Sequence, residues 1–249
     1  MPHFFINSKD VKNNTISISD KENYNHIAKS LRAKIGENLL LIDENQIQYE
    51  TTISDITNKN ITADIHNQYK SQRELQFDLY LAQVPLRSDA QNFVIEKATE
   101  LGCKAVYPLY SDNCALNKTV IQNKISKYQR IMYEASKQCE RANIPTCYDL
   151  ITFDELLNIK DKKIIAFCER NTNTTLHEYC KTNPIKICDK ILVIIGPEGG
   201  FSKSEFEKLK QNNIPMLTLG DLILKAETAT TVALGNIIYE FNNYKQNKI

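Results

Sequence analysis

Short runs of alternating apolar and polar positions fill the first part of the chain. Such runs, separated by turns rich in Asp, Asn and Gly, are typical of the strands of a small β-barrel. One helical pattern interrupts them at residues 24–31. The predicted strands cover residues 15–19, 38–42, 47–53 and 60–65. We therefore expect a small barrel that contains one short helix.

The pattern changes after a continuously polar stretch at residues 66–76 (HNQYKSQRELQ). From there on, apolar runs alternate with helical patterns, which favours a mainly parallel sheet covered on both faces. The predicted strands of this second part cover residues 77–84, 105–110, 163–168, 191–195 and 216–219. We place a domain boundary in the polar stretch and expect one domain at residues 1–72 and a second at residues 73–249.

A long amphipathic pattern predicts one helix over residues 118–142. Apolar side chains recur at spacings of three and four, which places them on one face. Four cations would lie together on an exposed stripe nearly opposite that face. They are Lys127, Arg130, Lys137 and Arg141. Such a stripe is compatible with an ordinary solvated face and with contacts to RNA phosphates.

Composition indicates a soluble globular protein with more than one core, since 42% of the 249 residues are hydrophobic and 24% are charged. The formal net charge is +1, so a polyanion must be bound by a local patch. The longest strongly apolar run, residues 191–195, is far too short to cross a membrane, and the N-terminus lacks a basic-then-apolar signal. We therefore expect a cytoplasmic protein without a membrane anchor.

Cysteines and histidines predict neither a metal site nor a disulfide framework. The seven cysteines show no C-x-x-C spacing, and the four histidines are scattered without a pair four residues apart. One basic turn stands out instead at residues 30–36 (SLRAKIG), and it is typical of a solvated turn or of a contact to the RNA backbone. The candidate RNA-binding residues are Arg32, Lys34, His26, Arg130 and Lys137.

The sharpest local signal is a buried strand at residues 191–195 that runs into the loop GPEGG at residues 196–200. Ser202 and Glu205 then form a capping box for the next helix. The loop is neither a dinucleotide fingerprint nor a P-loop, and it carries no basic residue for a phosphate. Because absent side chains let backbone groups approach closely, it suits a flat, uncharged ligand such as adenine. A plain strand-to-helix connection is the alternative.

A second strand, at residues 216–219, ends at Gly220 and leads through an apolar loop into a helix that starts near Glu227. Ligands of open α/β sheets bind at the carboxyl ends of the strands, so both glycine-containing exits can form walls of one pocket. Leu222 would be exposed on this loop unless it covered an apolar ligand or packed on a partner. Gly235 lies inside the following helix, where it costs about 1 kcal/mol relative to Ala unless close helix packing offsets that cost.

The two loops together closely resemble those of one family, the SPOUT-superfamily 16S ribosomal RNA (uracil-N3)-methyltransferases of the RsmE type. The matching loops read GPEGGFS at residues 196–202, and LG followed by ILKAETA at residues 219–229. The resemblance extends over nearly the whole chain. It includes the opening MPHFFI, His26 with Leu31 and Arg32, EKATELGC at residues 96–103, and Gln138 with Arg141.

This resemblance implies a SPOUT α/β fold whose C-terminal part is threaded as a deep trefoil knot, preceded by a small PUA-like, RNA-binding β-barrel. It also implies S-adenosylmethionine as methyl donor, 16S rRNA within the small ribosomal subunit as substrate, and a homodimer. Glu169 and Arg170 would form a third wall of the pocket. The residues implied to bind the cofactor are Gly196, Pro197, Glu198, Gly199, Gly200, Leu217, Leu219, Gly220, Ile223, Leu224, Ala226, Glu227 and Thr228.

Methylation at N3 of uridine requires loss of the imide proton and stabilisation of negative charge on the uracil oxygens. Arg141, Lys225 and Arg87 are the candidate charge stabilisers, and Arg141 ranks first because it matches a family position. Glu198 is the candidate to orient a donor or to accept the proton, with a helix cap as the alternative role. The family usually has two arginines in the loop where this chain has Leu222 and Lys225.

Two other functions are compatible with the same sequence. A SPOUT 2′-O-methyltransferase would share the cofactor loops, but the N-terminal barrel and the match at residues 96–102 argue against it. A non-catalytic RNA-binding or ribosome-assembly factor would explain why the family's arginines are replaced. Titration with S-adenosylmethionine separates an enzyme from such a factor.

Overall fold

The computed structural model describes residues 3–170 and 172–246, so the first two residues of the opening motif lie outside it. The chain divides into two compact units. The N-terminal unit comprises Met1–Glu74 and Ser136–Asn143, and the C-terminal unit comprises Leu75–Ala135 and Ile144–Ile249. Each unit is described by itself below.

The N-terminal unit is a six-stranded sheet in the order β1-β4-β5-β6-β3-β2, in which only the β1–β4 pair is parallel. Its core is apolar and includes Phe4, Ile16 and Leu41. The predicted helix is present as α1 (Lys21–Tyr24) continued by the π-helical turn η2 (Asn25–Ser30). A short 3-10 turn, η1 (Ser8–Asp10), precedes the second strand. The strands are β1 (His3–Phe5), β2 (Val11–Lys12), β3 (Thr15–Ile18), β4 (Asn38–Ile42), β5 (Ile47–Ile56) and β6 (Ile61–Lys70).

Two strands of this unit are longer than predicted, since β5 continues to Ile56 and β6 continues to Lys70. The apolar alternation of β6 ends at Ile65, yet the strand continues to Lys70 with every further side chain exposed. Its backbone stays paired with β5 there, for example Tyr69 opposite Gln48. A polar stretch can therefore extend a ladder that buries no apolar side chains, and the hydrophobic pattern does not reveal it.

The C-terminal unit is built on a sheet in the order β10-β8-β7-β12-β11-β13, with β9 paired to β8. Every pair in it is parallel. Five strands lie where the apolar runs predict them, and these are β7 (Asp78–Gln83), β8 (Ala105–Tyr110), β11 (Lys163–Phe167), β12 (Lys190–Ile195) and β13 (Met216–Leu217). The two-residue strands β9 (Thr146–Cys147) and β10 (Ile151–Thr152) were not predicted, because segments this short carry no recognisable apolar run.

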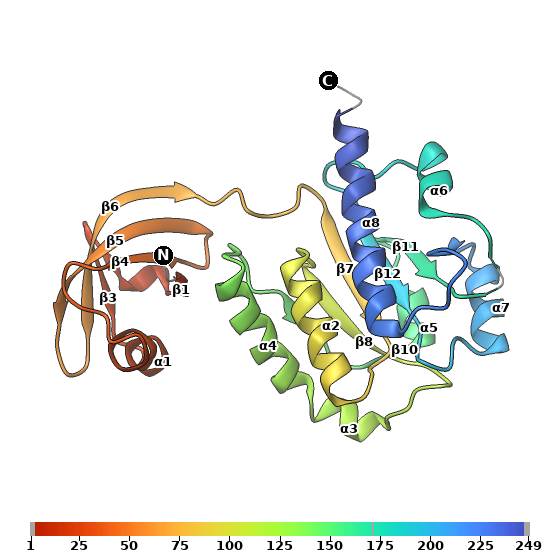
Figure 1. Ribbon diagram of the computed structural model, residues 1–249, viewed down its shortest axis with the longest axis horizontal. Helices are drawn as coiled ribbons and strands as arrows, with labels where there is room; N and C mark the ends of the chain where they lie inside the picture. Colours follow the sequence, from red (N-terminus) through yellow and green to blue (C-terminus); the bar gives the residue numbers. More distant parts are fainter. Residues whose placement is uncertain (1–2, 171, 247–249) are drawn as a thin grey trace. The chain divides into compact units, whose positions relative to one another are not determined.

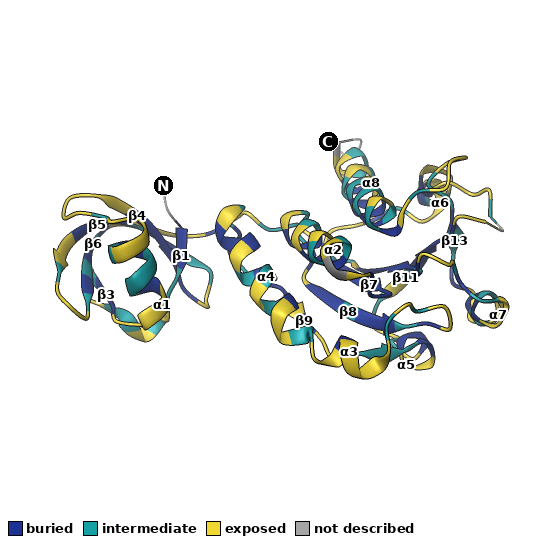
Figure 2. Ribbon diagram, turned by 60° about the horizontal axis from the view of Figure 1, so that its bottom comes forward, coloured by how far each residue is buried: buried dark blue, intermediate teal, exposed yellow. Residues whose placement is uncertain are grey.

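Helices cover both faces of this sheet, as a parallel sheet requires. Along β7, Leu79 and Leu81 enter one core, whereas Tyr80 and Ala82 enter the other. Helices α2 (Ser88–Glu100), α4 (Ile125–Gln138), α6 (Leu176–Thr182) and α8 (Ala226–Gln246) contribute to the first core, and α5 (Phe153–Leu157) and α7 (Lys203–Gln211) contribute to the second. Helices α2 and α8 lie side by side (Figure 1), and the strands beneath them are largely buried (Figure 2).

The predicted single helix over residues 118–142 is wrong in its extent. The structure has a short α3 (Lys118–Gln122), a break, and then α4, which ends at Gln138. Glu140 adopts a left-handed backbone conformation with φ 56°, so the helix cannot continue to Arg141. The longest described helix is α8, with 21 residues.

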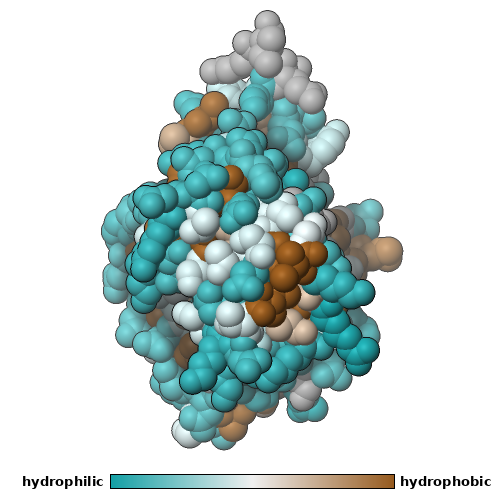
Figure 3. Space-filling view, turned by 90° about the vertical axis from the view of Figure 1, so that its left-hand side faces the viewer, coloured by the Kyte–Doolittle hydropathy of each residue, from teal (hydrophilic) through white to brown (hydrophobic). Residues whose placement is uncertain are grey.

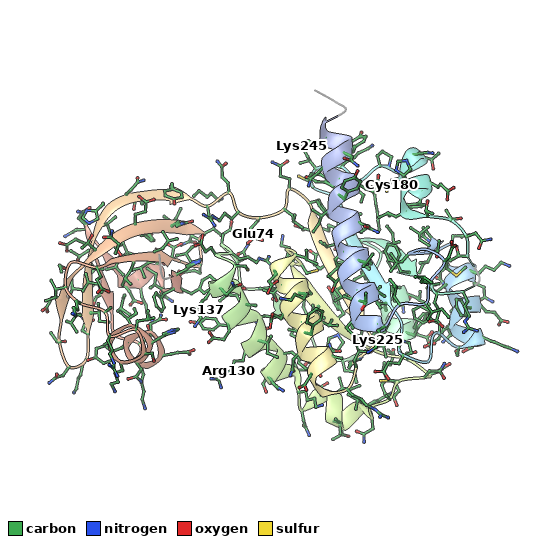
Figure 4. All side chains as sticks on the ribbon, viewed as in Figure 1. Glu74, Arg130, Lys137, Cys180, Lys225 and Lys245 are labelled. Atoms are coloured by element: carbon green, nitrogen blue, oxygen red, sulfur yellow. The ribbon has the colours of Figure 1, made fainter. Side chains whose placement is uncertain are left out.

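The predicted stripe of four exposed cations is wrong as well. Lys127 and Arg130 are exposed on α4, but Lys137 is buried and Arg141 is only 4% exposed. Ser136–Asn143, which holds both buried cations, belongs to the N-terminal unit, whereas Lys127 and Arg130 belong to the C-terminal unit. Arg130 and Lys137 are labelled on α4 in Figure 4. The amphipathic pattern continues past the point where the backbone leaves the helix.

Candidate active site

Three adjacent parallel strands of the C-terminal unit end at one edge of the sheet. β11 pairs with β12 on one side and with β13 on the other, so their carboxyl ends lie together. The segments that leave these strands are residues 168–170, 196–202 and 218–225. This is the edge at which open α/β sheets bind ligands.

The three segments enclose a cavity of about 910 Å³, which lies within the range of roughly 300–1,000 Å³ that is usual for small-molecule sites. The prediction that both glycine-containing exits meet around one pocket is confirmed. The lining residues that the sequence analysis names are Glu169, Arg170, Gly196, Pro197, Glu198, Gly199, Gly200, Leu219, Gly220, Leu222, Ile223, Leu224, Lys225, Ala226 and Glu227.

Two residues predicted to bind the cofactor, Leu217 and Thr228, are not among the lining residues. Leu217 is the last residue of β13 and points into the core. Thr228 lies in the first turn of α8 and is exposed. Other lining residues were not anticipated, and they include Cys168, Phe201, Lys203 and Thr218. Phe201 belongs to the GPEGGFS motif, but nothing in the local sequence distinguishes Cys168, Lys203 and Thr218 from ordinary loop and core positions.

One wall of the cavity, the segment 196–202, is fixed by a buried carboxylate. Glu205 in α7 is only 2% exposed, and it accepts hydrogen bonds from the Ser111 hydroxyl (3.1 Å), the Asp112 amide (3.1 Å) and the Ser202 amide (2.8 Å). The Ser202 side chain in turn accepts from the Glu205 amide, which completes the predicted capping box. The end of β8 is thereby tied to the start of α7.

Further bonds hold the same wall. The Asn113 amide donates to the Gly200 carbonyl at 2.9 Å, and the Asp112 carboxylate accepts from the hydroxyls of Ser202 and Ser204. The hydrogen bonds from these two serine hydroxyls hold the pKa of Asp112 below its ordinary value. Gly200 has φ +71°, a conformation that favours glycine. We call residues 196–202, with these partners, the fixed wall.

The opposite wall, residues 220–225, has a different character. Leu222 is 82% exposed, and Ile223 is also exposed. Gly220 is anchored through Thr218, whose hydroxyl accepts from the Gly220 amide at 3.1 Å. Within residues 3–170 and 172–246, no side-chain hydrogen bond or ion pair involves Leu222, Ile223, Leu224 or the ammonium group of Lys225. We call this segment the free wall.

The base of the free wall is secured by a buried polar pair. The Thr230 hydroxyl in α8 donates to the Gln83 Oε1 at the end of β7, at 2.5 Å, and both side chains are fully buried. The Gln83 amide donates to the Val84 carbonyl at 3.0 Å. The first turn of α8, which carries Ala226 and Glu227, is therefore positioned against the sheet.

The cavity is lined by charges of both signs. Its cationic residues are Arg170, Lys203 and Lys225, and its carboxylates are Glu169, Glu198 and Glu227. Lys225 precedes the first turn of α8 (Figure 4). Burial raises the pKa of the Cys168 thiol to about 12, so this cysteine is a neutral wall residue at neutral pH.

The four predicted catalytic residues fall into two groups. Lys225 and Glu198 line the cavity. Arg87 does not line it and is exposed at the N-cap of α2. Arg141 belongs to the N-terminal unit, where its guanidinium donates twice to the Glu74 carboxylate, at 3.2 and 2.6 Å. The sequence analysis did not single out Glu74, which lies 67 residues away from Arg141.

The predicted RNA-binding residues also differ in accessibility. Arg32 and Lys34 are exposed after η2, and Arg130 is exposed on α4. His26 is half-buried, with its ring edge-on to Phe4 at 5.3 Å between centroids. Lys137 is buried, which contradicts its place on an exposed stripe.

Metal-ligating clusters, disulfides and membrane-spanning helices are absent from the part of the chain that the structure describes. Within the described part of the chain, His, Cys, Asp and Glu side chains form no group of three or more that could hold a metal ion. No disulfide joins any of the seven cysteines in the part of the chain that the structure describes. No helix in residues 3–170 or 172–246 is both long enough and apolar enough to cross a membrane.

Comparison with known proteins agrees with this architecture. A family model described as an RNA methyltransferase domain matches residues 73–238, and one described as an RNA methyltransferase PUA domain matches residues 18–65. The chain is 31% identical to the ribosomal RNA small subunit methyltransferase E of Buchnera aphidicola subsp. Acyrthosiphon pisum, over 98% of this chain and 96% of that protein. It is 25% identical to the protein of the same name from Bacillus subtilis, over 91% and 90% of the two chains.

Solved structures share the fold. The ribosomal RNA small subunit methyltransferase E of Neisseria gonorrhoeae, which was solved bound to S-adenosyl methionine, superposes with a TM-score of 0.82 at 23% identity, over 95% of this chain and 96% of that one. The predicted fold class, a SPOUT-type α/β domain preceded by a PUA-like domain, is confirmed. With family models covering most of its length and a relative at 31% identity, the chain belongs to the RNA methyltransferase family that includes the ribosomal RNA small subunit methyltransferases E.

Proposed function

We propose that this protein transfers the methyl group of S-adenosylmethionine to N3 of a uridine in the 16S rRNA of the small ribosomal subunit. The single observation that carries the proposal is the cavity walled by both glycine-containing strand exits. The relative at 31% identity, which is named for small-subunit ribosomal RNA, supports the substrate class. A ribosomal substrate also favours a cytoplasmic location.

The residues of the cavity fit the proposed cofactor. Glycines at 196, 199, 200 and 220 expose backbone groups, and Leu219 and Leu224 supply apolar surface for a flat ring. The three lining carboxylates suit the positive charge of a sulfonium and an ammonium group, and the lining cations suit a carboxylate. When bound, S-adenosylmethionine supplies a methyl group that is already activated by its sulfonium.

The protein's own residues then have to orient the uridine and manage one proton and one charge. In this proposal Lys225 stabilises the negative charge that spreads to the uracil oxygens, and Glu198 accepts the imide proton or orients its acceptor. Because pairing hides N3 in a duplex, the target uridine has to be unpaired or turned out of the helix. The fixed wall holds the donor together with Gly220 and Leu224 at the two ends of the free wall, while the exposed part of the free wall around Leu222 and Lys225 meets the substrate.

We propose further that the C-terminal part is knotted and that the active form is a homodimer. Leu222 and Ile223 on the free wall and Tyr239 on α8 are large, exposed apolar side chains in the C-terminal unit, as expected for a surface that a second copy covers. In such a dimer, the exposed Arg87 would be supplied to the cavity of the partner, whereas Arg141 stays buried against Glu74. Sedimentation of the purified chain at several concentrations tests the dimer.

The proposed function is tested by nucleoside mass spectrometry of small-subunit rRNA from cells that lack this chain. The expected result is loss of 3-methyluridine, restored by the wild-type gene. Loss of a 2′-O-methylated nucleoside instead would indicate the related chemistry at ribose. Unchanged nucleosides, with no heat on titration of the pure protein with S-adenosylmethionine, would favour a ribosome-assembly factor, which the replacement of arginine by Leu222 makes the second candidate.

A further inference from the structure

Two polar side chains of the C-terminal unit, Gln83 and Thr230, are completely buried and bonded to each other. Hydrophilic residues cover most of the molecular face in Figure 3, as contact with water favours, whereas both of these side chains have 0% exposure. The Thr230 hydroxyl lies 2.5 Å from the Gln83 Oε1 and 2.8 Å from the Ala226 carbonyl oxygen. Neither Gln83 nor Thr230 lines the cavity, so any effect of the pair on the reaction has to pass through other residues.

The pair lies between the two walls of the cavity. Gln83 is the last residue of β7, and it lies opposite Ile195, the last residue of β12, from which the chain continues into the fixed wall. On the other side, Thr230 lies one turn after Ala226, which lines the cavity and directly follows Lys225 of the free wall. A short series of contacts therefore leads from the start of the fixed wall to the end of the free wall.

Apolar packing defines the cavity end of α8 less strictly than the other end. The first buried apolar residues of the helix are the small Ala226 and Ala233, and large ones follow further along, at Leu234, Ile237 and Phe241. Small side chains make fewer dispersion contacts, so they fix the position of a helix less firmly. A buried hydrogen bond is directional, and the bond from Thr230 to Gln83 therefore selects one position of this end of α8 on the sheet.

We propose that Gln83 and Thr230 are positioning residues, which set the spacing between the donor on the fixed wall and Lys225 on the free wall. This rests on the proposed function, since it assumes methyl transfer with Lys225 as charge stabiliser. The Ala229 amide donates to the Lys225 carbonyl at 2.8 Å, so the backbone of Lys225 follows the first turn of α8. A displacement of about 1 Å at a reacting centre can cost about 100-fold in rate. Loss of the buried bond therefore lowers turnover more than it lowers affinity for the donor.

The test compares four variants of the full-length protein. Thr230→Val removes the hydroxyl and keeps the shape of the side chain, whereas Thr230→Ser keeps the hydroxyl. Gln83→Met/Thr230→Val removes both polar partners together. The matched control is Thr231→Val, because the hydroxyl of Thr231 bonds within α8, to the Glu227 carbonyl at 3.0 Å.

Four quantities are measured for each variant. They are the single-turnover rate of methylation on small ribosomal subunits from cells that lack this chain, the dissociation constant for S-adenosylmethionine, the stability in urea, and the rate of amide hydrogen exchange at residues 225–230. The last three need no turnover, and the exchange is measured without donor.

Thr230→Val should lower the single-turnover rate about tenfold and leave the dissociation constant for S-adenosylmethionine within about twofold. The first turn of α8 should exchange its amide hydrogens faster than in the wild type. Thr230→Ser should restore the rate and the slow exchange, and Thr231→Val should change neither. Gln83→Met/Thr230→Val should be more stable in urea than Thr230→Val, because the Gln83 oxygen is no longer buried without a donor, yet its rate should stay low.

Several results would overturn the proposal. They are a wild-type rate or unchanged exchange with Thr230→Val, an equal loss of rate with Thr231→Val, no rescue by Thr230→Ser, a loss of donor affinity as large as the loss of rate, or a rate that recovers with stability in Gln83→Met/Thr230→Val. If the wild-type chain methylates the subunits, such a result rejects the positioning role alone. If the wild-type chain methylates nothing, the proposed function fails and the positioning role fails with it.

Discussion

The two walls of the cavity are built in opposite ways. The fixed wall is held through the buried Glu205 and through Asp112 and Asn113, and its backbone groups have defined positions. The free wall carries exposed Leu222 and Lys225 and is secured only at its two ends. The difference indicates a division of labour: a preorganised wall suits a donor that is the same in every turnover, and an adaptable wall suits a large substrate that has to be admitted and released.

The largest effect is expected from Lys225→Gln in the free wall. If Lys225 stabilises charge on the uracil oxygens, kcat on small-subunit rRNA should fall about 100-fold. The dissociation constant for S-adenosylmethionine, measured by calorimetry, should stay within about twofold. Lys210→Gln, at an exposed lysine of α7, is the control. If affinity for S-adenosylmethionine fell as much as turnover, Lys225 would be a donor-binding residue. That result would contradict the proposed division of labour between the walls.

Glu205→Ala should loosen the fixed wall. Three donors would lose their acceptor, so the free energy of unfolding should fall by about 2 kcal/mol and affinity for S-adenosylmethionine by about tenfold. Urea denaturation and calorimetry measure the two effects. Glu207→Ala, at an exposed glutamate of the same helix, should change neither. Normal donor affinity in a destabilised Glu205→Ala protein would show that the wall need not be rigid to bind the donor.

Gly200→Ala, in the same wall, should lower the free energy of unfolding by about 1 kcal/mol. The backbone there has φ +71°, and an added Cβ would lie 3.0 Å from the Glu169 carboxylate. Thermal unfolding should therefore shift to lower temperature, with weaker donor binding.

Gly235→Ala in α8 is the contrast. The expectation that close packing explains Gly235 is not met, since within the described chain an added Cβ there meets no atom within 4 Å. Alanine should stabilise this helix by up to about 1 kcal/mol.

The smallest effect concerns acid stability. Bonds from Ser202 and Ser204 hold the pKa of Asp112 below its ordinary value of 3.8. A carboxylate with a lowered folded-state pKa stabilises the protein above 3.8, and this contribution disappears as the pH falls below that value. The stability difference between wild type and Asp112→Asn should therefore be present at pH 6 and vanish near pH 2. A stability difference of equal size at pH 6 and pH 2 would contradict this role of the Asp112 carboxylate in the fixed wall.

Local signals predicted much of this architecture. The apolar runs located the five longer or central parallel strands, and Ser202 with Glu205 predicted the start of α7, because the two members of a capping box are only three positions apart. Glu205 also ties α7 to the end of β8, through hydrogen bonds from Ser111 and Asp112 that span 94 and 93 residues. Local sequence signals cannot predict a contact over such a separation. The rigidity of the fixed wall is a tertiary property, and it emerges only when β8 and β12 lie in one sheet.

For Arg141, a clear local pattern led to a wrong prediction. Its spacing continued the pattern of the long helix, and no glycine or proline before it signalled an end. The backbone nevertheless turns left-handed at Glu140, and the Arg141 guanidinium pairs with Glu74. Periodicity reports where side chains would point if the helix continued, but it does not report that a distant carboxylate and a strained residue end it.

The buried bond between Gln83 and Thr230 joins positions 147 residues apart. Translation delivers Gln83 long before Thr230, so the donor pocket cannot close until α8 has left the ribosome. Contacts this distant also slow folding, because a long loop has to be ordered before they form. Chains that lack α8 therefore cannot sequester the methyl donor, and each molecule gains its catalytic competence late in folding.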